Sequence, residues 1–237
     1  MIKSIFINNI RFAIFFLLIL LVDVYVKIYS NNPNDRFLTK PLVLLSLITY
    51  YYFNKKHKNQ KLEQNVLLAF IFFLLGDIMI LNYLNSLFLT LSMLFFGLGK
   101  VFFCLKFKSK EDFEFSRLLP FSVIIYIFIT FIISVVYKNL QAFLIPGLIT
   151  LFISLLMLNL AYLRKDKFSK ESYLYVLFGC ILFVLVESFN AIYTFNKNLP
   201  FPNFLIVLFY GISIYLIVVG IVKERIIKVL NETDNDA

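Results

Sequence analysis

Long apolar runs, separated by short polar segments, dominate this chain. A helix of about 20 apolar residues crosses a hydrocarbon core of ~30 Å, because each residue adds about 1.5 Å. Lipid offers no hydrogen-bond partner to an open sheet or an exposed loop, so the runs predict helices. We predict eight spans: Ile10–Ile28, Phe37–Phe53, Val66–Leu84, Leu87–Leu105, Leu118–Tyr137, Leu140–Leu163, Tyr173–Phe195 and Asn203–Val222.

Two of these spans depart from the plain pattern. The second is short and opens on Lys40-Pro41, so part of it is expected at the membrane interface. The sixth carries Pro146-Gly147. Proline removes a backbone donor, so we expect a kink there or the loss of the first helical turns.

The composition agrees with a membrane protein. Of 237 residues, 61% are hydrophobic and 30 are Phe, and the mean hydropathy is +0.86. A soluble domain of this length could not hide so much apolar surface. We expect one transmembrane domain over residues 1–230 and a short polar tail at 231–237.

The basic residues predict the orientation. With eight spans, both termini and three connecting segments lie on one side, and these hold 17 of the 23 Lys and Arg residues. The positive-inside rule places that side in the cytoplasm. The prediction is an all-α polytopic transmembrane bundle of eight helices with both termini cytoplasmic. Topology accounts for the net charge of +9, so we expect no nucleic-acid partner.

Four ionisable residues interrupt the predicted spans: Asp23, Asp77, Lys100 and Glu187. A charge near the bilayer centre costs at least ~2.5–3.5 kcal/mol, so each is a candidate functional residue. The three carboxylates fall within roughly 6 Å of one another in depth, in the outer half of the bilayer. Lys40 enters that layer from the outer interface, whereas Lys100 lies a turn or more deeper.

These charges predict a polar pocket that opens toward the outer side. A structural alternative stays open, in which Asp77 and Lys100 pair only to hold the third and fourth spans together. Charges on five different spans are harder to explain by packing, which favours the pocket.

Several short motifs are shared with a known family. Lys40-Pro41-Leu42 opens the second span, Leu75-Gly76-Asp77 lies in the third, and Phe95 to Lys100 follow in the fourth. Val186-Glu187-Ser188-Phe189-Asn190-Ala191 and Tyr210 occupy the last two spans. In this order the chain resembles the YhhN family of eight-span membrane proteins, which includes the lysoplasmalogenases. The resemblance extends from about residue 37 to residue 222.

The resemblance implies a hydrolase that cleaves the vinyl ether of lysoplasmalogens to a fatty aldehyde and a glycerophospho-alcohol. Three residues depart from the family pattern: Lys100 stands where histidine is usual, Glu187 where aspartate is usual, and Ile214 where glutamine is usual. The carboxylates that acid chemistry needs remain at Asp77 and Glu187.

The chemistry suits the residues available. A vinyl ether cleaves after protonation of its β carbon, and the resulting oxocarbenium ion needs a nearby carboxylate and a water, much as in glycosidases. We assign these two carboxylate roles to Asp77 and Glu187 without deciding which is which. Lys40 is the expected anchor for the lipid phosphate, and Lys100 would favour the ionised form of the acid it approaches.

Tyr210 is a candidate hydrogen-bond donor in the pocket, with an ordinary packing role as its alternative, and Asp23 is a candidate supporting residue. The chain has no G-x-S-x-G motif and no set of metal ligands, so we expect neither metal nor cofactor. The expected partners are a lysophospholipid substrate and membrane lipids, in a bacterial cytoplasmic (inner) membrane.

Two rival functions stay open. Acids and a lysine within spans also suit a proton-coupled transporter or a lipid-binding protein. The loss of the family's histidine and glutamine also permits a catalytically inactive relative.

Overall fold

The structure is a computed structural model that describes residues 2–30, 32, 35–55, 60–108, 115–140, 143–196 and 199–225. The predicted polar tail at 231–237 lies outside these residues. The described part contains a 3-10 helix at Ile80–Asn82 and nine α-helices: α1 Ile2–Ile7, α2 Asn9–Tyr29, α3 Arg36–Asn54, α4 Gln60–Met79, α5 Ser86–Phe107, α6 Phe115–Leu140, α7 Leu144–Tyr162, α8 Lys170–Phe195 and α9 Pro202–Val222.

Each of the eight predicted spans coincides with one helix from α2 to α9, and the ninth helix is the short α1. Local signals explain several boundaries. The side chains of Asn8 and Asn85 accept hydrogen bonds from backbone N–H groups in the first turns of α2 and α5. Pro146 lies in the first turn of α7, which begins at Leu144. An N–H group in the first turn of a helix has no carbonyl partner within the helix, so the missing N–H of Pro146 costs no helical hydrogen bond. The start of α7 at Leu144 agrees with the predicted loss of the first turns.

Six of the nine helices are long and apolar enough to cross a membrane: α2, α4 with the 3-10 turn, α5, α7, α8 and α9. The chain is therefore a multi-pass membrane protein. The helix α3 is not in this set; it carries Arg36 and Lys40. In the part of α6 whose side chains the structure describes, Ile125–Val136 forms an apolar stretch that is shorter than a membrane span. Membrane crossing by α3 and α6, which the count of eight spans requires, stays a prediction.

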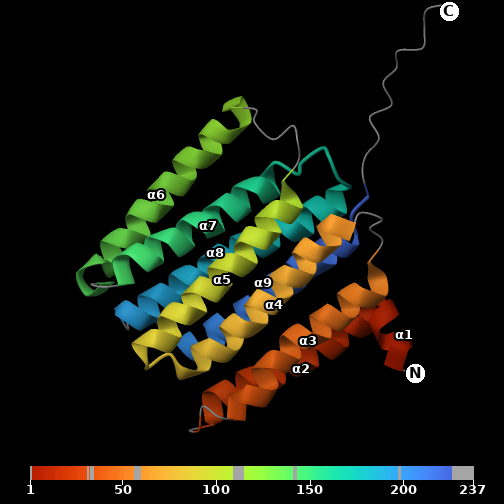
Figure 1. The fold of residues 1–237 in the computed structure, drawn as a ribbon, viewed down its shortest axis with the longest axis horizontal. Coiled ribbons are helices and arrows are strands. Elements are labelled where there is room, and N and C mark those ends of the chain that lie inside the picture. The colour runs from red at the N-terminus through yellow and green to blue at the C-terminus, as the bar shows by residue number, and fades with distance from the viewer. Residues whose placement is uncertain are drawn as a thin grey trace, which may run out of the picture.

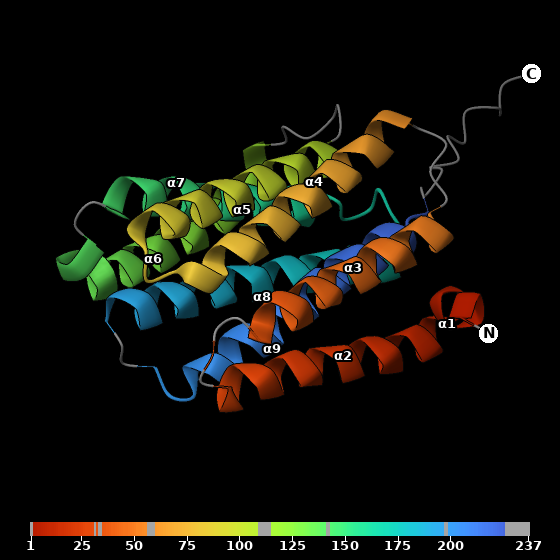
Figure 2. The same cartoon turned by 60° about the horizontal axis from the view of Figure 1, so that its bottom comes forward.

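The long helices run roughly side by side (Figures 1 and 2), and their contacts close a ring. Neighbouring pairs in contact are α2 with α3, α3 with α4, α4 with α5, α5 with α7, α7 with α8, α8 with α9 and α9 with α2. Helix α6 stands at the edge of the molecule against α7 and α8 (Figure 1). The ring has an interior to which seven helices can contribute side chains.

Polar and apolar residues are distributed as a bilayer requires. Asp77 and Lys100 have 1% and 0% of their surface exposed, whereas Leu38 and Ile145 have 75% and 69% exposed. Apolar side chains can face lipid at no cost, but charged ones must find partners inside the bundle. The candidate functional residues therefore lie in the interior of the ring.

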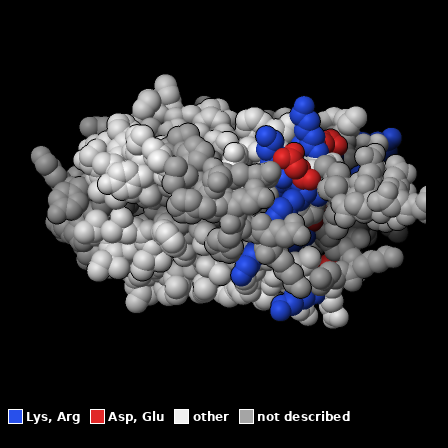
Figure 3. All heavy atoms as spheres, turned by 90° about the horizontal axis from the view of Figure 1, so that it is seen from above, with Lys and Arg blue, Asp and Glu red and all other residues white. Residues whose placement is uncertain are grey.

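Charged side chains gather at one end of the molecule, the end that also holds both chain termini (Figures 1 and 3). Buried ion pairs lie within this end. Glu224 accepts from Lys106 Nζ at 2.7 Å and from Arg164 Nη2 at 2.9 Å, which joins the ends of α5, α7 and α9. The sequence predicts that this end faces the cytoplasm, and that orientation stays a prediction.

Single-cysteine labelling tests the orientation. Leu84 is 89% exposed in the turn before α5, at the end away from the termini, and Lys165 is exposed at the charged end. The native Cys104 and Cys180 are buried, which keeps background labelling low. We expect a membrane-impermeant maleimide to label Leu84→Cys in intact cells and Lys165→Cys only after permeabilisation. The reverse pattern would invert the topology.

Candidate functional site

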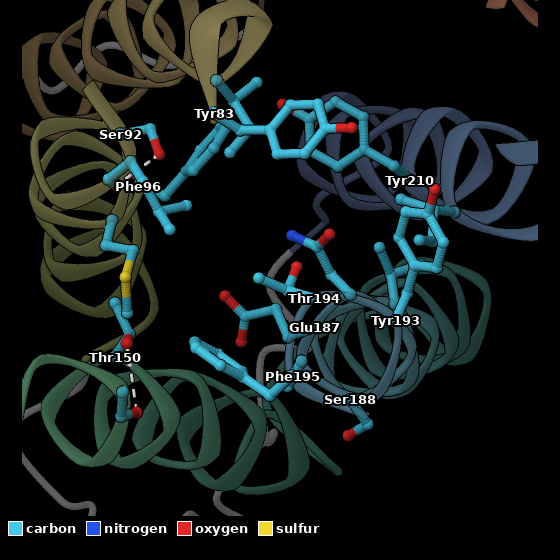
Figure 4. Close-up of a pocket in the computed structure, with 18 of the residues that line it drawn as sticks. Tyr83, Ser92, Phe96, Thr150, Glu187, Ser188, Tyr193, Thr194, Phe195 and Tyr210 are labelled. Atoms are coloured by element: carbon cyan, nitrogen blue, oxygen red, sulfur yellow. Dashed lines mark hydrogen bonds between the residues drawn. The ribbon is translucent and has the colours of Figure 1, made fainter. Parts of the chain in front are cut away.

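A cavity of about 240 Å³ lies toward the end of the ring opposite the charged one. Its lining changes character from one side to the other. The α2 and α3 side supplies Asp23, Lys27, Arg36 and Lys40. The α6 and α7 side supplies Ile132, Ile133, Val136, Leu144, Leu148 and Leu151. Glu187, on α8, points its carboxylate into the open space between the helices (Figure 4).

Asp23 holds the polar side of the cavity in place. Its Oδ1 accepts from Arg36 Nε at 3.1 Å and from Thr39 Oγ1 at 2.7 Å, and its Oδ2 accepts from Arg36 Nη2 at 2.7 Å. A forked contact of this kind fixes direction as well as distance, because two parallel N–H groups meet two carboxylate oxygens. The pair joins α2 to the first turn of α3.

Asp77 is paired with Lys40. Lys40 Nζ lies 3.0 Å from Asp77 Oδ1, and the Tyr210 hydroxyl lies next to the same carboxylate. Lys40 and Tyr210 line the cavity, whereas Asp77 lies behind them with 1% of its side chain exposed. Among the described residues, neither Asp77 Oδ1 nor the Tyr210 hydroxyl completes a hydrogen bond of standard geometry. Buried polar atoms of this kind are rare and call for an explanation, such as a water or a ligand.

Glu187 is paired with Lys100. Lys100 Nζ donates to Glu187 Oε1 at 2.5 Å, to Ser154 Oγ at 2.8 Å and to the Thr150 carbonyl at 3.1 Å. The Ser154 hydroxyl also donates to Glu187 Oε2. Lys100 is fully buried, but 24% of the Glu187 side chain is exposed. Both carboxylate oxygens of Glu187 therefore accept hydrogen bonds from neighbouring helices.

Aromatic rings lie between the two lysine–carboxylate pairs. Lys40 Nζ is 5.9 Å and 5.6 Å from the ring centroids of Phe96 and Tyr210, and Lys100 Nζ is 5.9 Å from that of Phe183. The Tyr210 ring in turn contacts both phenylalanines. Asp77 and Glu187 lie within ion-pair distance of different lysines, Lys40 and Lys100 respectively.

The structure gathers most of the predicted site residues at one end of the ring but pairs them differently. The alternative in which Asp77 pairs with Lys100 is wrong, because Lys100 bonds Glu187. Lys40, predicted to anchor a phosphate, is the ion-pair partner of Asp77. Although Lys100 was predicted a turn or more deeper than the carboxylates, its long side chain reaches Glu187.

Sequence reasoning missed Arg36, Lys27 and Ser154 as members of this site. Arg36 could have been found, since it precedes Lys40 by one helical turn and so shares its face. In the sequence analysis, Lys27 entered only the count of basic residues on the outer side of the membrane. Ser154 carries no signal in the sequence, because nothing distinguishes it from the other serines in spans.

The part of the chain that the structure describes holds no group of three or more His, Cys, Asp and Glu side chains that could bind a metal ion.

A model of the YhhN family matches residues 35–221, which include Lys40, Asp77, Lys100, Glu187 and Tyr210. The chain belongs to the YhhN family. The match covers α3 to nearly the end of α9, so Asp23 and Lys27 on α2 of this YhhN protein lie before it. Comparisons with curated proteins and with solved structures found no match.

The Lys100–Glu187 pair predicts a stability pattern. Glu187→Gln should destabilise the bundle by about 3 kcal/mol, because it leaves a fully buried ammonium without its counter-charge. The double variant Glu187→Gln with Lys100→Met should recover most of that loss, since no buried charge is left unpaired. Thermal unfolding in detergent checks both. Equal stability of the single and double variants would contradict the pairing.

Proposed function

We propose that this protein is a membrane-embedded hydrolase that cleaves the vinyl ether bond of lysoplasmalogen-type lysophospholipids. The products are a fatty aldehyde and a glycerophospho-alcohol. Family membership supports the proposal, and the two-sided cavity with a carboxylate facing into it is the observation that carries it.

The cavity fits an amphiphile with one chain. A lysolipid has a charged head group and a single hydrocarbon chain, joined at the glycerol. The polar wall on α2 and α3 suits the head group, and the apolar wall on α6 and α7 suits the chain. Glu187, on α8, lines the same cavity and would then face the ether at the junction.

The reaction requires one proton to be delivered and another to be removed. Protonation of the β carbon converts the vinyl ether into an oxocarbenium ion, which water attacks at the carbon bound to the ether oxygen. The attacking water loses a proton, and a hemiacetal forms. The hemiacetal hydroxyl then passes its proton to the glycerol oxygen, the bond between that oxygen and the hemiacetal carbon breaks, and the aldehyde and the alcohol are released.

One ion pair suits the protonation of the vinyl ether, and the other suits the attack by water. Glu187, whose oxygens accept hydrogen bonds from Lys100 and Ser154, stabilises the cation and accepts the proton of the attacking water. The group formed by Asp77, Lys40 and Tyr210 delivers the first proton, and Lys40 and Tyr210 are its cavity-facing members. Water in the cavity returns the proton from Glu187 to this group after each turnover.

Variants of the two carboxylates test the proposal. We expect Asp77→Asn to lose vinyl ether hydrolysis while remaining folded, and the charge-neutral double variant Glu187→Gln with Lys100→Met to lose it by at least about 100-fold. The assay follows free aldehyde from purified full-length protein in detergent, with lysoplasmalogen as substrate and an acyl lysolipid as control. Lys165→Gln, at the opposite end, should keep full activity.

Full turnover in the folded Asp77→Asn protein would remove Asp77 from the reaction. No aldehyde from the unchanged protein would reject the hydrolase. Proton-dependent uptake into reconstituted vesicles without product release would instead favour a transporter. We also propose a bacterial cytoplasmic membrane as the location, since both the positive-inside pattern and the lipid substrate are compatible with it.

A further inference from the structure

The charges around the cavity do not cancel. Three carboxylates line the cavity or lie directly behind its wall, and each has one cation within ion-pair distance: Asp23 has Arg36, Asp77 has Lys40, and Glu187 has Lys100. Asp35, a further carboxylate at this end, accepts from Ser30 and is not part of the lining. Lys27 is a fourth cation in the cavity lining. No carboxylate in the described part of the chain lies within ion-pair distance of its ammonium group.

The surroundings of Lys27 are those of a cation held at a cavity wall. It lies in the last turn of α2 and is half-buried, with its Nζ 5.6 Å from the ring centroid of Tyr83, which also lines the cavity. Arg36, Lys40 and Asp23 are its charged neighbours. Asp23 accepts from Arg36 and Thr39, and its one negative charge is matched by Arg36, so the positive charge of Lys27 is left over in the count.

Arg36 adds a second donor on the same wall. Its contact with Asp23 uses Nε and Nη2, and Nη1 takes no part in that pair. A guanidinium whose one edge is fixed by a carboxylate presents its remaining N–H groups in a defined direction, which suits the oxygens of a phosphate.

We propose that Lys27, supported by Arg36, binds the phosphodiester of an amphiphilic ligand in this cavity. A phosphodiester carries one negative charge, which equals the single unbalanced positive charge of the lining. The apolar wall formed by α6 and α7 accommodates the hydrocarbon chain of the same molecule. Lys40 is unsuited to this role, because Asp77 already neutralises it.

This assignment deepens the proposed function and rests on its substrate class, a lysophospholipid. Its test needs no catalysis. A 1-O-alkyl lysophosphatidylethanolamine has a saturated ether in place of the vinyl ether, so the proposed reaction cannot cleave it. Binding of this probe therefore reports on head-group recognition even if the protein hydrolyses nothing.

The experiment uses titration calorimetry in detergent to compare two lipid probes and inorganic phosphate, with the parent protein and three variants. We expect Lys27→Gln to weaken binding of the alkyl lysophospholipid on the order of tenfold, because a charge-assisted contact is lost. Binding of the neutral 1-O-alkylglycerol should change less than about twofold, and Lys27→Arg should retain phospholipid binding. The matched control is Lys165→Gln, which removes an exposed lysine at the opposite end and should bind both probes as the parent does.

Three outcomes would overturn the proposal. Equal weakening of both probes by Lys27→Gln would show that Lys27 only packs α2 against Tyr83. Unchanged phospholipid binding in that variant would remove Lys27 from recognition. A Lys27-dependent affinity for inorganic phosphate that equals the affinity for the alkyl lysophospholipid would identify a site for free phosphate.

Discussion

The pairing of buried charges is the constraint on which the rest of this structure depends. A carboxylate or an ammonium group alone in hydrocarbon is expensive, so a fully buried one needs a partner of opposite sign from another helix. Asp23 joins α2 to α3, Asp77 joins α4 to α3, and Glu187 joins α8 to α5. The same contacts that hold the helices in register also set the chemistry of the cavity wall.

The two lysine–carboxylate pairs differ in their access to the cavity, and this difference divides their roles. Glu187 faces the cavity, while its lysine is fully buried behind it. At the other pair the order is reversed, because Lys40 faces the cavity and Asp77 is behind. One pair therefore presents negative charge and the other positive charge. Phe96, Phe183 and Tyr210 lie between the pairs and limit direct contact between their charges.

The helices were predictable from the sequence because hydropathy and length decide whether a segment can cross a bilayer, and the eight predicted spans coincide with α2 to α9. Asp77, Glu187 and Lys100 were predictable as candidate functional residues, because a charged side chain within a membrane span is costly. Their partners were not, since pairing depends on which helix faces which across the ring and on the reach of lysine side chains. Lys100 illustrates this, because its Cα depth suggested separation from Glu187 while its Nζ bonds that residue. Ser154 completes the Glu187 site through packing of α7 alone, for which one sequence offers no signal.

Helix α6 stands outside the ring, yet Ile132, Ile133 and Val136 complete the cavity wall. This wall is apolar, whereas the opposite wall carries ammonium and guanidinium groups. For the proposed reaction, the two products would leave in different directions. The aldehyde would return to the bilayer past α6, and the water-soluble alcohol would depart past α2 and α3, so neither product would obstruct the exit of the other.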